Sequence, residues 1–148
     1  MALGLHWEWR AFGQLSETLR RRIDSLPALL PEPWQLTDCY LWAPGCAANI
    51  KLRAGDLKVK YFLEATAGLE RWLEDEKDIY PFPLAASILS QVSAALAVAL
   101  PPCASAAIHR DQFLALLAAA QPPVKLVIVE KVRQFYQLDL EGGLDPAL

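Results

Sequence analysis

The sequence contains few cysteines, and their arrangement does not define a fold. Cys39, Cys46 and Cys103 form no C-x-x-C pair, and their number is odd. This disfavours a disulfide framework or a zinc site and favours buried free thiols in a reducing compartment. The N-terminus also lacks an apolar run behind a basic start, so it does not predict a signal peptide. We therefore expect a cytoplasmic protein.

The sequence has neither an excess of basic residues nor a long uninterrupted apolar run. Its 14 Lys and Arg are outnumbered by 17 Asp and Glu. General nucleic-acid binders are usually basic overall, so we do not expect DNA as a partner. The stretch 84–100 carries no charge, but serine and glutamine interrupt it and two prolines follow it. Because a membrane helix needs about 20 mostly apolar residues, we predict a buried amphipathic helix here and no membrane partner.

The residues that are present predict a folded chain. Hydrophobic residues make up 54% of the 148 positions, which is enough for a core in a single domain spanning 1–148. Alternating and helical patterns predict the following elements: strands at 5–10, 36–42, 49–53, 57–60 and 124–137, and helices after Ser16 and at 68–77, 84–100 and 111–120. Strands followed by helices and a late strand favour an α+β fold with a mainly antiparallel sheet.

The clearest pattern is a β-hairpin formed by 49–53 and 57–60, joined by a loop that contains Gly55. Side chains alternate between the two faces of a strand, so the apolar residues of both runs share one face. The opposite face carries four cations: Lys51, Arg53, Lys58 and Lys60. Like charges on neighbouring strands destabilise a sheet, so a bound anion would explain this row. A solvated outer face is the alternative.

Other predicted strands also carry ionisable residues on one face. These residues are His6, Glu8 and Arg10; Asp38 and Tyr40; and Lys131 and Arg133. Helices would cover the apolar faces, against which we expect the tryptophans at 7, 9, 34 and 42 to pack. The charged faces would either lie open or line a closed barrel, where buried cations need an anion. Phosphate oxygens are suitable partners because they accept charge-assisted hydrogen bonds from Arg and Lys.

In their order and spacing, these runs resemble the CYTH superfamily, the triphosphate tunnel metalloenzymes. His6-x-Glu8-x-Arg10 is similar to the first strand of that family, E-x-E-x-K, and Lys131-x-Arg133 is similar to its late K-x-R strand. The resemblance runs from about residue 5 to residue 141. It implies a mainly antiparallel, tunnel-like β-barrel with helices packed on its outer face. It also implies a small-molecule triphosphate, nucleotide or polyphosphate as the partner.

The resemblance also implies roles for individual residues. Glu8 and Arg10 would be catalytic, and Glu8, Glu141 and His6 would hold Mg²⁺ or Mn²⁺. The phosphate-binding residues would be Arg10, Lys51, Arg53, Lys58, Lys60, Lys131 and Arg133. The reaction would be metal-assisted attack of water on a phosphorus, with the cations stabilising the developing negative charge.

The sequence departs from the family pattern in its carboxylates. His6 stands in place of the first Glu and adds no negative charge, and alternation places Glu130 on the face opposite Lys131. Two functions are therefore open. The protein is either a metal-dependent triphosphatase or a non-catalytic protein that binds a nucleotide or polyphosphate in the same tunnel. A third possibility is an open basic sheet that docks an acidic protein or RNA. The sequence leaves the oligomeric state undecided.

Overall fold

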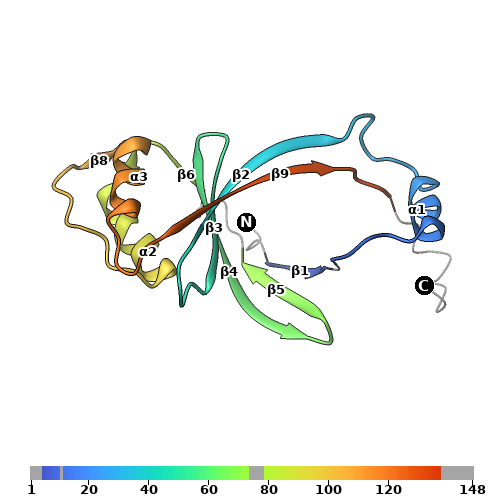
Figure 1. The fold of residues 1–148 in the computed structure, drawn as a ribbon, viewed down its shortest axis with the longest axis horizontal. Helices are drawn as coiled ribbons and strands as arrows, with labels where there is room; N and C mark the ends of the chain where they lie inside the picture. Colours follow the sequence, from blue (N-terminus) through green and yellow to red (C-terminus); the bar gives the residue numbers. More distant parts are fainter. Residues whose placement is uncertain (1–4, 11, 74–78, 138–148) are drawn as a thin grey trace. The chain divides into compact units, whose positions relative to one another are not determined.

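The structure, a computed structural model, describes residues 5–10, 12–73 and 79–137, with only the backbone of His6. Figure 1 shows the order of the elements along the chain. The chain divides into two compact units, which are described separately: unit 1 contains residues 1–10 and 37–129, and unit 2 contains residues 11–36 and 130–148. The single domain expected for 1–148 stays a prediction.

Seven strands form one mostly antiparallel sheet. They are β1 (Leu5–Trp9), β2 (Trp34–Trp42), β3 (Ala48–Arg53), β4 (Asp56–Thr66), β5 (Leu69–Leu73), β6 (Ile79–Pro81) and β9 (Lys125–Arg133). Their order is β1-β5-β4-β3-β2-β9, and β6 also pairs with β4. The short strands β7 (Leu84–Ala85) and β8 (Ala107–Ile108) pair separately. The predicted α+β class with a mainly antiparallel sheet is confirmed, and β1 and β9 are the two ends of this order among the described strands.

The predicted basic hairpin is present as β3 and β4. The register pairs Arg53 with Asp56, so the loop consists of Ala54 and Gly55 alone. Their φ values of 49° and 92° are both positive, as expected for the two-residue turn that matches the twist of paired strands. Glycine accepts this conformation freely, whereas alanine adopts it at a cost.

The predicted helix over 68–77 is wrong where the structure describes it, because residues 69–73 form the strand β5. Ala67 and Gly68 have φ values of 49° and 79° and join β4 to β5 in a second two-residue turn. The spacing of Leu69, Trp72 and Leu73 suits a helix, and residues 69–73 do not alternate between apolar and polar side chains. The turn and the pairing with β4 and β1 decide in favour of the strand.

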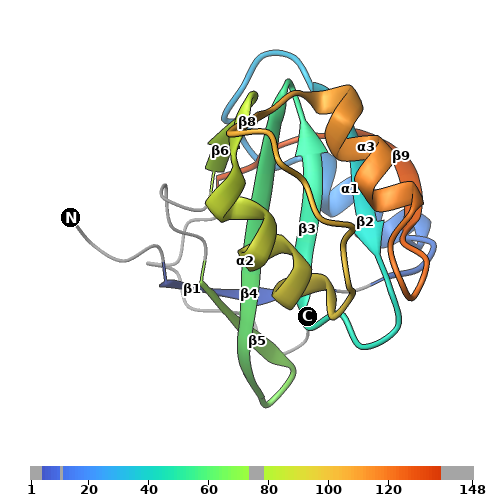
Figure 2. The same cartoon turned by 90° about the vertical axis from the view of Figure 1, so that its left-hand side faces the viewer.

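Two helices, α2 (Ala86–Leu96) and α3 (Arg110–Ala118), cover one face of the unit 1 sheet, as Figure 2 shows. Both correspond to predicted helices. The hairpin's apolar residues form the sheet side of this core: Ile50, Leu52, Leu57 and Val59, each at most 5% exposed. Val92 and Leu96 of α2 and Phe113 and Leu117 of α3 form the helix side. The basic face of the hairpin is therefore the face that these helices leave uncovered.

The expectation that the tryptophans pack against helices is wrong. Trp9 is 70% exposed and Trp34 is 56% exposed, and Trp7 and Trp42 are close to half exposed. The helix-covered core is centred on the hairpin strands β3 and β4, and none of these four residues belongs to it. Three of them instead contact a cation or another ring: the Arg71 guanidinium lies 5.9 Å from the Trp7 ring centre, Lys125 lies over the Trp42 ring, and Trp34 contacts Phe135.

Unit 2 contains α1 (Glu17–Asp24), which begins as predicted after Ser16, whose side chain accepts a hydrogen bond from the Leu19 amide (3.2 Å). Backbone hydrogen bonds join the segment after this helix to the end of β9: Leu29 N–H to Phe135 O, at 2.8 Å, and Gln137 N–H to Pro27 O, at 2.9 Å. Among the described helices of either unit, none is both long enough and apolar enough to span a membrane.

Candidate anion-binding site

Two lysines of the basic hairpin face each other directly. The register of β3 and β4 places Lys51 opposite Lys58, and Asn49 opposite Lys60. The Lys51 ammonium lies 6.0 Å from the centre of the Tyr40 ring on β2. Lys58 is half-buried and forms no ion pair within the part of the chain that the structure describes. Directly opposed cations repel each other, so this arrangement is stabilised by an added negative charge.

The cation nearest the turn is held by a carboxylate of the neighbouring strand. Arg53 donates from Nε to Asp38 Oδ1 (2.5 Å) and from Nη2 to Asp38 Oδ2 (2.6 Å). Asp38 is fully buried, and the Tyr40 hydroxyl lies 3.3 Å from its Oδ2. A buried carboxylate needs such a partner, and the two-point geometry fixes the guanidinium plane. Asp38, which the sequence placed on the charged face, is thus a structural partner of Arg53.

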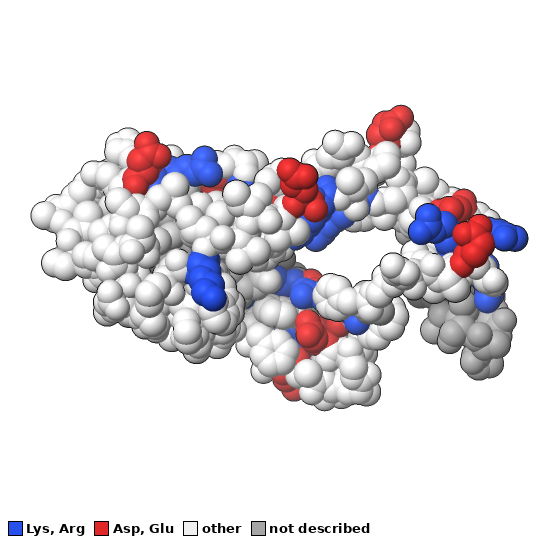
Figure 3. Space-filling model, viewed as in Figure 1, with Lys and Arg blue, Asp and Glu red and all other residues white. Residues whose placement is uncertain are grey.

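The other end of the hairpin is neutralised from β1. Lys60, only 7% exposed, is ion-paired with Glu8 through Nζ and Oε1. Arg10 also donates to the same carboxylate, with its Nε 2.9 Å from Glu8 Oε2. The resemblance assigns Glu8 to a metal and Arg10 to a phosphate, whereas the structure pairs Glu8 with two cations. Figure 3 shows blue and red atoms side by side over β1, β4 and β5.

An aromatic ring on this face was missed by the sequence analysis. Trp72 of β5 is 9% exposed, and its ring centre lies 5.0 Å from Lys60 Nζ and 5.3 Å from Arg10 Cζ. Its indole N–H donates to Glu70 Oε2 (2.9 Å). Cations over an indole face are attracted by the ring quadrupole. Residues 69–73 do not alternate between apolar and polar side chains, so the local pattern does not predict that Trp72 lies on a strand.

A second carboxylate lies beside Glu8. The register of β1 and β5 pairs Glu8 with Glu70, and Arg10 is 3.9 Å from Glu70 Oε2. Two neighbouring carboxylates can contribute to a divalent-cation site, but no group of three metal-ligating side chains occurs within 5–10, 12–73 and 79–137. Glu8 is already compensated by two cations. The described donor set therefore does not fit a resident Mg²⁺ or Mn²⁺ by itself.

The remaining predicted site residues are placed as follows. His6 lies on β1 opposite Trp72 in the register. Lys131 and Arg133 lie on the last part of β9, within unit 2, and their role in phosphate binding stays a prediction. Glu141 lies outside the described residues. The set gathered by unit 1 is Glu8, Arg10, Lys51, Arg53, Lys58 and Lys60.

Comparisons of the chain with protein-family models, with curated proteins and with solved structures found no match.

Proposed function

We propose that unit 1 binds a triphosphate- or polyphosphate-bearing small molecule on the basic face of the β3–β4 hairpin. The observation that carries the proposal is the direct opposition of Lys51 and Lys58, on the sheet face that α2 and α3 leave uncovered. An oligophosphate would bridge the two ammonium groups and relieve their repulsion. The resemblance to the triphosphate tunnel family supports the same ligand class, and closure of the sheet into a tunnel around the ligand is part of this proposal.

The ion pairs on either side make the site selective for a ligand of the right length. Arg53 is fixed by Asp38, and Lys60 is fixed by Glu8 and lies over Trp72. These two cations are held in place before a ligand arrives, so little side-chain entropy is lost when they contact it. The outer phosphates of an oligophosphate bound at Lys51 and Lys58 would lie towards these two groups. Inorganic monophosphate is too short to use all four cations.

The proposal is binding, and we derive no hydrolytic step. The resemblance implies a metal held by Glu8, but that carboxylate is compensated by Lys60 and Arg10, and the described residues offer no group of three ligands. Metal-dependent hydrolysis of a phosphoanhydride stays a prediction. Docking of RNA or of an acidic protein on the same face is the competing function.

Thermal unfolding with added inorganic triphosphate tests the proposal. A ligand at about 100 times its dissociation constant stabilises the folded state by about 2.7 kcal/mol, which raises the unfolding midpoint by about 9 °C. Matched samples with monophosphate, and with sodium chloride at equal ionic strength, should shift much less. Equal shifts of the unfolding midpoint in all three samples would show that the protein has no site selective for triphosphate. A parallel phosphate-release assay with and without Mg²⁺ reports separately on hydrolysis.

A short RNA and a poly-glutamate peptide complete the experiment. If either raises the unfolding midpoint more than inorganic triphosphate at equal charge concentration, the basic face is a macromolecular docking surface and the small-molecule proposal is wrong.

A further inference from the structure

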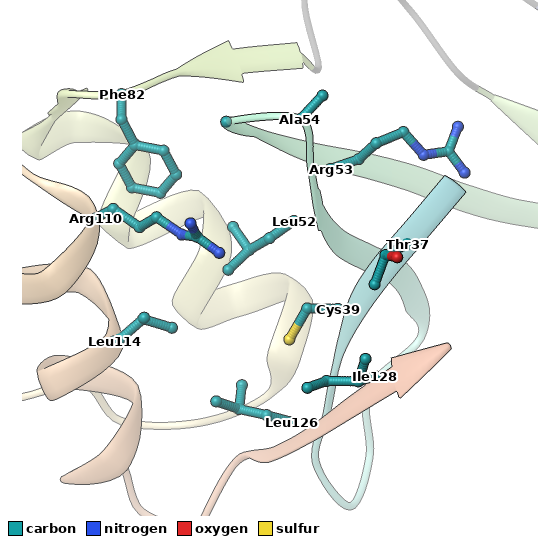
Figure 4. Close-up of a pocket in the computed structure, with 11 residues that line it drawn as sticks. Thr37, Cys39, Leu52, Arg53, Ala54, Phe82, Arg110, Leu114, Leu126 and Ile128 are labelled. Atoms are coloured by element: carbon teal, nitrogen blue, oxygen red, sulfur yellow. The ribbon is translucent and has the colours of Figure 1, made fainter. Parts of the chain in front are cut away.

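A cavity lies in unit 1, on the side of the sheet opposite the basic face. Its volume is about 470 Å³, within the range of about 300–1,000 Å³ typical of small-molecule sites. It is lined from β2, β3, β9, α3 and the segment before β7, as Figure 4 shows. Its apolar wall is formed by Cys39, Leu52, Phe82, Leu114, Leu126 and Ile128.

Two arginines line this cavity, but only one presents its charge to it. The guanidinium of Arg53 is bound to Asp38 on the other face, and Figure 4 shows it pointing away from the other lining residues. Arg110, the first residue of α3, points inward, with its guanidinium near Leu52 (Figure 4). Within the described residues, Arg110 has no ion pair or hydrogen-bond partner.

The cavity wall also contains apolar surface that is in contact with water. Leu126 is 48% exposed and Ile128 is 72% exposed. Burying such surface is favourable in proportion to its area, so an apolar ligand body would gain from lying against β9. A guanidinium without a protein acid beside this wall would in turn bind a carboxylate through two parallel hydrogen bonds.

We propose that this cavity binds a small amphipathic carboxylate, of the class of medium-chain fatty acids. The chain would lie between Leu114, Leu126 and Ile128, and the carboxylate would accept hydrogen bonds from Arg110. The site is independent of the proposed oligophosphate site, because Asp38 and Arg53 face the opposite side of β2 and β3 from Cys39 and Leu52. A phosphate-free preparation therefore binds the carboxylate equally well.

The Cys39 thiol gives a direct readout, because it lines the cavity and is a half-buried free cysteine. In a Cys46→Ser, Cys103→Ser background, Cys39 is the only thiol of the chain. The rate of its modification by a maleimide is measured with decanoate below its micelle-forming concentration. We expect saturable protection by decanoate, weaker protection by decanol, which lacks the charge, and none by acetate, which lacks the chain.

The Arg110→Ala variant tests the head-group contact. Loss of a charged hydrogen bond weakens binding by about tenfold or more, so the decanoate protection curve should move to correspondingly higher concentration. The matched control is Arg20→Ala, which removes an exposed arginine from α1 and should leave the curve unchanged. Circular dichroism confirms that Arg110→Ala is folded, as expected for an exposed position.

Three outcomes would overturn the proposal. Absence of decanoate protection in the wild-type background removes the cavity as a binding site. Equal protection by decanoate and decanol, or an unchanged curve for Arg110→Ala, would show that Arg110 does not bind the carboxylate. Protection would then reflect non-specific adsorption of the apolar chain.

Discussion

Asp38 and Arg53 form a two-point ion pair across β2 and β3, with both donor–acceptor distances at 2.6 Å or less. The Asp38 side chain is fully buried and that of Arg53 is 20% exposed. This pair fixes one end of the basic hairpin, and the pairing of Lys60 with Glu8 fixes the other. Lys51 and Lys58 lie between these two anchored ends.

The Asp38→Asn variant measures what the anchored end contributes to stability. Removing one partner of a buried ion pair leaves the other charge uncompensated, so we expect the free energy of unfolding to fall by about 3 kcal/mol in urea titration. Glu17→Gln on α1 is the control, since its pair with Arg21 is largely exposed and contributes less than about 1 kcal/mol. Equal losses in the two variants would show that burial of Asp38 does not strengthen the pair.

The Glu8→Gln variant separates the two roles assigned to Glu8. If Glu8 only compensates Lys60 and Arg10, its neutralisation makes both cations more available, and inorganic triphosphate binds about fivefold more tightly. If Glu8 holds a catalytic metal, the same change abolishes Mg²⁺-dependent phosphate release. Calorimetric titration and a phosphate-release assay on one preparation distinguish these results. Weaker triphosphate binding in the variant would contradict the compensating role.

The turn between β3 and β4 offers a stabilising substitution. Ala54 has a φ of 49°, and alanine pays about 1–2 kcal/mol for the left-handed region, whereas asparagine tolerates it. Ala54→Asn creates the Asn-Gly pair that this turn prefers, and we expect the free energy of unfolding to rise by about 0.5–1 kcal/mol. Ala67→Asn in the second turn should act similarly. A decrease for both variants would mean that the turns are of another type.

The hairpin, its two faces and the two covering helices could be predicted because period-two alternation reports directly on which side chains share a face. The strand β5 could not be predicted, because the spacing of Leu69, Trp72 and Leu73 suits a helix and only pairing with β4 and β1 makes the segment a strand. The turn signal Ala67-Gly68 was weak because alanine seldom adopts a positive φ. Trp72 could not be assigned to the site because it lies on β5, which the sequence predicts as part of a helix.

The residues that form ion pairs with these cations could not be predicted from the sequence either. It showed a row of positive charge and predicted a bound anion, but Asp38 and Glu8 supply two of the counter-charges. Identifying them requires the register of β2 with β3 and the position of β1, which are set by long-range pairing. The cavity lined by Arg110 could not be predicted for a similar reason, because its wall is formed by five segments that are separate in the sequence.

Calorimetric titration of inorganic triphosphate into the wild-type chain and Lys58→Ala tests the oligophosphate site most directly. Lys58 has no ion pair with any described residue, so removing it leaves the anchored pairs intact. We expect affinity to fall by about tenfold or more in Lys58→Ala, and to stay unchanged in the control Arg20→Ala. Equal affinities in the wild type and Lys58→Ala would show that the basic face of the hairpin is not where triphosphate binds.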